Sequence, residues 1–160
     1  MTKTEIRAQI EASICAKQAV LDDGKLIAQI ETLATNCMKC LQSGGKIIFA
    51  GNGGSFADAQ HLSAELISRF MFDRAPLASL VLGANNSAIS AIGNDYGYDQ
   101  VFAREFKGVV NTGNVAIPIS TSGNSQNILV AVNEAKQQGL VTMALTSAVG
   151  SKLAALCNCL

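Results

Sequence analysis

The chain has 160 residues, about the length of one domain, and 49% of them are apolar, which excludes a disordered or tail-like protein. Twelve basic residues balance twelve acidic ones without any basic cluster, so the surface that nucleic-acid or anionic-membrane binding requires is missing. Only 15% of the residues are charged. Because a small domain has a high surface-to-volume ratio, we expect part of the apolar surface to be buried in an oligomer.

The start of the chain mixes charges, and no apolar run approaches the roughly 18 residues of a membrane span, so we expect a soluble, cytoplasmic protein. The five cysteines do not form the even-numbered pattern of a secreted disulfide framework. Cys37 and Cys40 have the spacing of half a zinc knuckle or of a redox pair, but their segment is predicted to be the middle of a helix. We therefore expect the cysteines to be buried thiols in a reducing compartment.

Two helices are predicted first. Ile6, Ile10 and Ile14 form one apolar stripe at helical spacing. A second stripe consists of Leu26, Ile27, Ile30, Leu33, Ala34, Cys37, Met38 and Leu41. The pair Gly44-Gly45 is a signal for the end of this second helix.

From residue 46 onward, apolar strands alternate with helices. Strands are predicted over 46–50, 77–82, 115–119 and 140–145. Helices are predicted over 55 to about 72, near 87–92, from 125 to Gly139, and over 151–156. This order predicts an α/β fold: a three-layer open parallel sheet with helices on both faces, flavodoxin-like or Rossmann-like, preceded by the N-terminal helices.

Two loops follow predicted strands, at the edge where open α/β sheets bind ligands. The glycine loop, 51–55, lets the backbone approach a ligand, and Ser55 with Asp58 fits a capping box. The serine loop, 120–125, places four hydroxyl groups around one turn, and Gly123 permits a positive φ. Hydroxyls and helix N-terminal amides can hold a phosphate without lysine. The alternative is that both loops are ordinary strand-to-helix turns.

Nucleotide sites fit these loops less well. The glycine loop is G-x-G-G-S rather than G-x-G-x-x-G, and Asp73 falls before the second strand instead of at its carboxyl end. No G-x-x-x-x-G-K-[ST] motif is present in the chain, so a P-loop is excluded.

The predicted helix after the glycine loop carries His61, Glu65 and Arg69 at i, i+4 and i+8. They form a polar line beside an apolar stripe of Ala59, Leu62, Leu66 and Phe70. A single histidine near an apolar face is often structural, and a glutamate four residues later is often its ion-pair partner. The same spacing can also ligate one zinc ion from one helix face.

These features resemble the phosphoheptose isomerases, a family of single sugar-isomerase (SIS) domain enzymes. The resemblance covers about residues 44–156 and rests on the segments 51–55, 57–61, 64–66, 69–70, 91–97 and 119–125. It implies one SIS domain over 1–160, with N-terminal helices over 1–43 and a phosphosugar-binding core over 44–160. It also implies a cytoplasmic homotetramer with active sites at subunit contacts.

The implied reaction interconverts sedoheptulose 7-phosphate and D-glycero-D-manno-heptose 7-phosphate through an enediol, toward the ADP-heptose of the lipopolysaccharide core. The positions implied to contact the phosphorylated sugar are Asn52, Gly53, Gly54, Ser55, Glu65, Asn94, Asp95, Ser120, Thr121, Ser122 and Ser125. The residues matching His61 and Glu65 are catalytic and ligate one zinc ion per subunit, and Glu65 is also the implied base.

The chain departs from the family pattern in two places. The family continues beyond the position of Leu160 with a strand and a helix bearing a Gln and a His that complete the zinc site, so we expect a core truncated at its C-terminus. These 160 residues are then expected to bind zinc weakly and to turn over slowly or not at all. In addition, residues 83–86 replace a Thr/Asp-rich stretch after the second strand.

Two alternatives remain within this resemblance. One is a non-catalytic SIS adaptor that binds the bacterial replication initiator protein as a tetramer. The other is an isomerase of another sugar phosphate, such as a pentose phosphate. Adaptors of the first kind lose the pattern of the His/Glu helix and of the glycine loop, and both are intact here.

Overall fold

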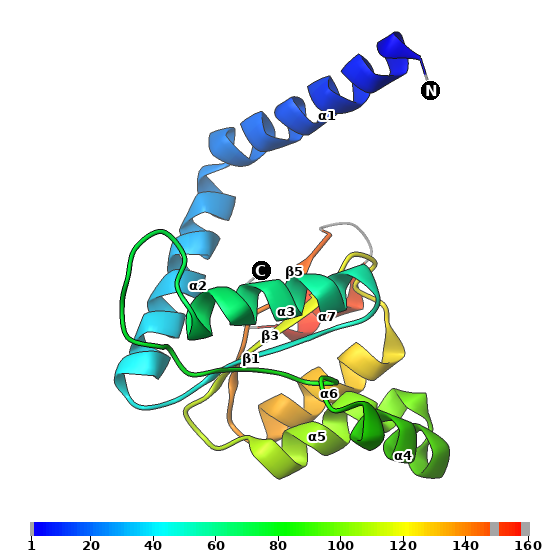
Figure 1. Ribbon diagram of the computed structural model, residues 1–160. Helices are drawn as coiled ribbons and strands as arrows, with labels where there is room; N and C mark the ends of the chain where they lie inside the picture. Colours follow the sequence, from blue (N-terminus) through cyan, green and yellow to red (C-terminus); the bar gives the residue numbers. More distant parts are fainter. Residues whose placement is uncertain (1, 148–150, 158–160) are drawn as a thin grey trace.

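A five-stranded parallel sheet organises the computed structural model, which describes residues 2–147 and 151–157. The strands are β1 (Ile47–Gly51), β2 (Ser79–Val81), β3 (Val115–Ser120), β4 (Val141–Thr142) and β5 (Leu145–Thr146). Their order is β2-β1-β3-β4, and β5 also pairs with β3. β1 and β3 are in register from Ile47 with Val115 to Gly51 with Ile119, so their carboxyl ends lie together. The predicted parallel sheet is confirmed (Figure 1).

The predicted strand over 140–145 is divided into β4 and β5, and the cause lies in β3. The Met143 N–H donates to the Ala116 carbonyl at 2.9 Å. In a parallel ladder, residue 118 would donate the next bond to the Met143 carbonyl, but Pro118 has no N–H. The ladder therefore breaks here and resumes where Ile119 pairs with Leu145.

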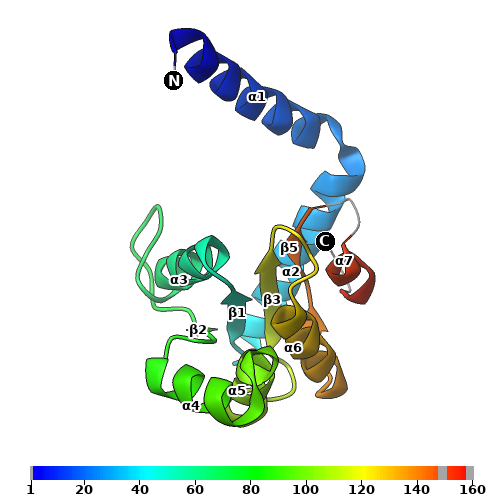
Figure 2. The same cartoon turned by 90° about the vertical axis from the view of Figure 1, so that its right-hand side faces the viewer.

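Helices cover both faces of the sheet (Figure 2). On one face, α2 (Gly24–Gln42) and α3 (Gly54–Ile67) pack against Ile47 and Phe49. The other face, which includes Ile48 and Ala50, is covered by α4 (Asn86–Tyr96), α5 (Val101–Val109), α6 (Gln126–Gln137) and α7 (Lys152–Leu156). The sides alternate along β1 because successive strand side chains point to opposite faces. The two-sided α/β architecture is thus confirmed.

Both N-terminal helices form as predicted. Helix α1 (Lys3–Asp22) extends away from the sheet and has no buried residue among those described (Figure 1, blue). Asp23 ends α1 and caps α2 by accepting from the Lys25 and Leu26 N–H groups. Gly44 has φ +78°, and the Gly45 N–H returns to the Cys40 carbonyl at 2.9 Å, so the predicted end of α2 is confirmed.

Helix α3 differs from its prediction at both ends. Its N-cap is Gly53, with no side-chain hydrogen bond, so the capping box of Ser55 and Asp58 is wrong. The helix stops at Ile67 rather than near residue 72, and Arg69 therefore lies outside the line of His61 and Glu65. The physical reason is a contact from beyond the helix, because Arg74 folds back and its guanidinium donates to the Glu65 and Leu66 carbonyls in the last turn.

The segment between α4 and β3 contains two elements that were not predicted from the sequence. A short 3₁₀ helix, η1 (Tyr98–Gln100), leads into α5, whose buried residues are Val101, Phe102, Ala103 and Phe106. Helix α4 is also longer than predicted and extends to Tyr96. Phe102 and Phe106 are four residues apart, a helical spacing that could have indicated α5.

The cysteines are less buried than expected. Cys40 is buried, Cys37 and Cys157 are half-buried, and Cys15 on α1 is exposed. Cys159 lies outside the described residues. Within residues 2–147 and 151–157, no helix has the length and hydropathy needed to cross a bilayer.

Candidate functional site

The glycine loop turns sharply where β1 meets α3. A Cβ atom at Gly51 would lie 2.5 Å from the Ser55 carbonyl oxygen, so only glycine allows the chain to fold back this closely. Gly53 has φ +54°, and the Ser55 N–H donates to the Asn52 carbonyl at 3.0 Å. The first turn of α3 is consequently presented at the carboxyl edge of the sheet.

The serine loop separates its hydroxyl groups into two kinds. Ser120 is buried, and its Oγ accepts from the Gly123 N–H at 3.2 Å and lies 3.4 Å from the Ser125 Oγ. Thr121 and Ser122 are exposed. The predicted positive φ at Gly123 is confirmed at +62°. Two hydroxyl groups thus shape the turn, while two face outward.

Helix α7 holds this loop from behind. The Leu153 N–H donates to the Gly123 carbonyl at 3.0 Å, and the Lys152 N–H to Asn124 Oδ1 at 3.3 Å. A Cβ atom at Gly123 would collide with the Ser151 hydroxyl. The serine loop therefore has a defined shape that depends on residues far along the chain.

A cavity of about 540 Å³ joins the two loops. Its lining includes three predicted site residues, Ser55, His61 and Thr121. The remaining lining residues are Asp58, Leu62, Ile119, Leu145, Thr146 and Ser147. Thr146 and Ser147 were missed, although their place at the end of the last strand could have indicated them.

His61 and Glu65 lie side by side on α3. His61 Nε2 is 3.7 Å from Glu65 Oε1, and the side chains are 74% and 32% exposed. An imidazole nitrogen and a carboxylate oxygen are donors that suit zinc. Among the described residues, however, no group of three metal-ligating side chains occurs. The pair fits as two of the ligands of a zinc site.

Four of the other predicted residues line separate hollows. Asn52 and Gly53 line a cavity of about 140 Å³ together with Tyr98. Asn94 and Asp95 lie exposed on α4, where the Asn94 amide donates to Asp95 at 2.8 Å, and they line a different depression. One copy of the chain therefore does not bring Asn94 and Asp95 to the cavity of His61.

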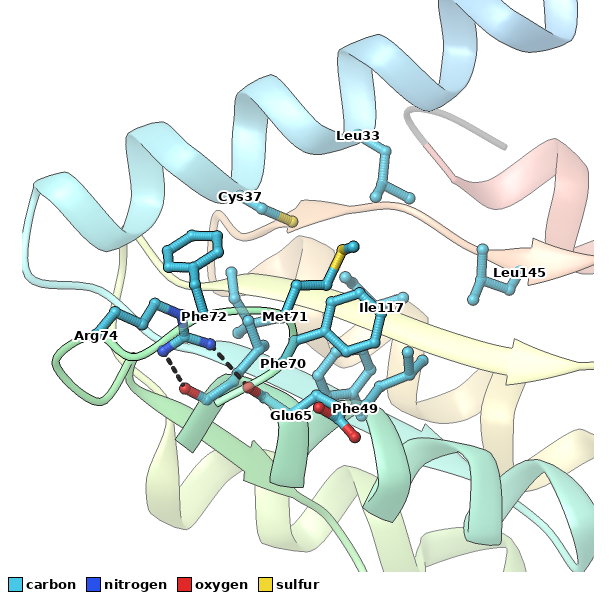
Figure 3. Close-up of a pocket in the computed structure, with 13 residues that line it drawn as sticks. Leu33, Cys37, Phe49, Glu65, Phe70, Met71, Phe72, Arg74, Ile117 and Leu145 are labelled. Carbon is cyan, nitrogen blue, oxygen red and sulfur yellow. Dashed lines mark hydrogen bonds between the residues drawn. The ribbon is translucent and has the colours of Figure 1, made fainter. Parts of the chain in front are cut away.

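An apolar groove of about 460 Å³ lies between α2, α3 and the sheet, with Glu65 at its lining (Figure 3). Phe70, Met71 and Phe72 contribute to it and remain largely exposed. Burial, reinforced by Cys40, raises the pKa of Cys37 in this groove to about 11. The Cys37 thiol is thus protonated at neutral pH, which does not favour the redox pair. Because the side chains that line this groove are mainly apolar, the groove does not suit a phosphate group.

Comparison with known proteins identifies relatives of this chain. Residues 16–147 match the SIS domain family. The chain is 47% identical over 153 residues to the phosphoheptose isomerase of Aneurinibacillus thermoaerophilus, covering 96% of this chain and 77% of the relative. It is 45% identical over 152 residues to that of Sulfurimonas denitrificans, covering 95% of this chain and 78% of the relative.

Solved structures of the same family also resemble this chain. The phosphoheptose isomerase from Neisseria gonorrhoeae has a TM-score of 0.88 at 39% identity, covering 98% of this chain and 80% of that one. The corresponding protein from Francisella tularensis has a TM-score of 0.89 at 36% identity, with coverage of 99% and 82%.

Proposed function

Because the chain belongs to the SIS-domain family of phosphoheptose isomerases, we propose that it interconverts sedoheptulose 7-phosphate and D-glycero-D-manno-heptose 7-phosphate. The reaction class is that of an aldose-ketose isomerase. The cavity at the carboxyl edge of the sheet supports a location for this chemistry. Ser55, Thr121 and His61 line one cavity at the carboxyl edge of the sheet, with Glu65 beside His61. The adaptor alternative is not favoured, because the relatives are isomerases.

Phosphate binding is assigned to the two loops. Thr121 and Ser122 offer exposed hydroxyl groups, and the serine loop leads into the N-terminus of α6, where the helix dipole favours an anion. Gly53 and Gly54 are exposed at the start of α3, and Ser55 follows them. Binding of the remote phosphate would hold the sugar carbons in a fixed position over α3.

Proton transfer is assigned to Glu65 and His61. Ketose-to-aldose isomerisation moves a proton between adjacent carbons, so one base must reach both carbons, and a second group must act on the oxygen atoms. In the proposal, the Glu65 carboxylate takes the C–H proton and returns it to the neighbouring carbon. His61 polarises the carbonyl oxygen and stabilises enediolate charge, as would a zinc ion that it helps to hold. The hydroxyl proton passes from one sugar oxygen to the other to complete the exchange.

Zinc is part of the proposal, with His61 and Glu65 as two of its ligands. A bound zinc ion polarises oxygen atoms as a Lewis acid. We expect His61→Ala to lower the zinc content measured by elemental analysis after equilibration with Zn²⁺. Cys37→Ala is the control, because Cys37 belongs to the alternative thiol site. Loss of zinc in Cys37→Ala but not in His61→Ala would assign the metal to the cysteines instead.

We further propose that residues 1–160 form one domain, in a cytoplasmic homotetramer that supplies heptose for the lipopolysaccharide core. Packing of Leu33, Cys37 and Leu41 of α2 against the sheet supports the single domain. The free thiols of Cys15, Cys37 and Cys40 support a reducing compartment. The exposed apolar residues of α1 support association of several copies.

The reaction is tested by proton exchange. The protein is incubated with sedoheptulose 7-phosphate in D₂O, and deuterium incorporation at carbon is followed by NMR. Glu65→Gln keeps the shape of the side chain but removes the base, so exchange should stop while sugar-phosphate binding, measured by calorimetry, persists. Glu134→Gln, which alters a carboxylate paired with Lys107, is the control and should exchange normally. Near-normal exchange in Glu65→Gln would assign the base to another residue.

A further inference from the structure

We propose that Asn127, a residue outside the predicted set of substrate contacts, is a positioning residue that fixes the glycine loop relative to the serine loop. It acts through a reciprocal amide pair with Asn52. This inference rests on the proposed function, because it concerns how the two loops hold a sugar phosphate.

The amide pair joins residues that are 75 positions apart. Asn127 is the second residue of α6 and is only 3% exposed. Its Nδ2 donates to Asn52 Oδ1 at 2.9 Å, and Asn52 Nδ2 donates to Asn127 Oδ1 at 2.9 Å. Two parallel hydrogen bonds between planar groups restrict rotation as well as distance.

Neighbouring hydrogen bonds lock the orientation of both amides. The Ile128 N–H donates to Asn127 Oδ1 at 3.0 Å, and only an oxygen atom can accept this bond. The orientation of Asn127 determines that of Asn52. The Tyr98 hydroxyl then donates to Asn52 Oδ1 at 3.3 Å. Turning either amide over would place donors against donors.

The pair lies where the sheet no longer aligns the chain. The paired register of β1 and β3 ends at Gly51 and Ile119, and both loops continue beyond it. Each loop contains a glycine with positive φ, Gly53 and Gly123, at which the backbone has many alternatives. The amide pair links the glycine loop to the start of α6 beyond the last paired residues of β1 and β3. It therefore sets the spacing between the amides of the glycine loop and the hydroxyls of the serine loop.

Asn127→Ala should raise KM for sedoheptulose 7-phosphate about tenfold and change kcat less, since misplaced binding groups weaken contacts made in both the ground and transition states. Asn127→Ser is measured in parallel. Its hydroxyl is shorter and can still accept from the Ile128 N–H, so less is lost from the fold. The same rise in KM is expected.

A double-mutant cycle tests whether Asn127 acts through Asn52. Asn52→Ala and the double variant Asn52→Ala/Asn127→Ala should have KM values within about twofold of each other, because the second substitution removes a partner that no longer has a function. Additive effects would mean that Asn127 acts independently of Asn52, and would overturn the proposal.

Asn114→Ala is the matched control. Asn114 is also 3% exposed and also joins distant segments, since its Oδ1 accepts from the Lys46 N–H at 2.9 Å. It lies at the opposite edge of the sheet, just before β3. Its loss should lower the melting temperature comparably while leaving KM unchanged. An equal rise in KM in Asn114→Ala and Asn127→Ala would show that the role of Asn127 is purely structural.

The outcomes separate this inference from the proposed function. If the unsubstituted protein neither binds nor isomerises sedoheptulose 7-phosphate, the proposed function fails. If it does both, and KM in the two Asn127 variants equals that of the unsubstituted protein, only the positioning role fails.

Discussion

The hydroxyl groups of the serine loop are expected to differ in their contributions to ligand binding and to stability. Ser120 is buried within the turn, whereas Ser122 is exposed and its Oγ accepts only from the nearby Asn124 N–H among the bonds described. We expect Ser122→Ala to weaken sugar-phosphate binding by about 1–3 kcal/mol with little change in melting temperature. Ser120→Ala should lower both. Calorimetry and thermal unfolding measure the two effects, and undiminished affinity in Ser122→Ala would remove this residue from the phosphate site.

Glu105 makes stability depend on pH. Burial raises its pKa, against the hydrogen bond from the Gly83 N–H, which lowers it. A carboxyl group with a raised folded pKa favours folding at low pH, and this contribution is lost as pH rises above the ordinary value of 4.5. Glu105→Gln stays neutral and keeps the acceptor. Its melting temperature relative to the unsubstituted protein should therefore rise between about pH 4 and pH 7. A constant difference would contradict the assignment.

At the scale of elements, Arg74 determines where α3 ends. Its guanidinium donates to the Glu65 carbonyl at 2.7 Å and to the Leu66 carbonyl at 2.9 Å (Figure 3). The last turn of α3 has no basic residue of its own, so Arg74 supplies the positive charge that a helix C-terminus favours. The same residue thus fixes the backbone that carries the proposed base.

We expect Arg74→Ala to destabilise the protein by about 1–2 kcal/mol, measured by urea unfolding, because two helix carbonyls lose charged donors. The Leu77 N–H, which donates to the Leu66 carbonyl at 3.0 Å, should also exchange faster with solvent. Arg104→Ala is the control, since its guanidinium stacks on the Tyr96 ring at the surface. An equal loss of unfolding free energy in both variants would show that the contact of Arg74 with α3 makes no specific contribution to stability.

At the scale of the whole molecule, the exposed apolar surface predicts association. Ile6, Ile10 and Ile14 are 43%, 56% and 60% exposed on α1, a helix that extends away from the sheet and has no buried residue among those described (Figure 1). We expect the double variant Ile10→Asp/Ile14→Asp to sediment with a lower mass than the unsubstituted protein, since charges on this stripe oppose its burial. The control Ala8→Asp/Ala12→Asp places the same charges on the opposite face of α1. A monomeric mass for the unsubstituted protein would contradict the proposed tetramer.

Local sequence patterns were enough to predict the alternating strands and helices, the two loops and the His61/Glu65 spacing. Each of these follows from residues close together in the chain: a helical period, a strand-to-helix turn, or a glycine that permits a positive φ. The parallel sheet, the end of α2 and the kink at Gly123 were predictable for this reason.

Other features depend on contacts between separate segments, so they became visible only in the folded chain. Arg74 ends α3 early, and Pro118 of β3 breaks the ladder that divides β4 from β5. The pairing of Asn127 with Asn52 left no pattern in the sequence, because 75 residues separate them. The same holds for the placement of Asn94 and Asp95 away from His61. Local spacing determines which groups can share a helix or a turn, whereas the path of the folded chain determines which of them meet.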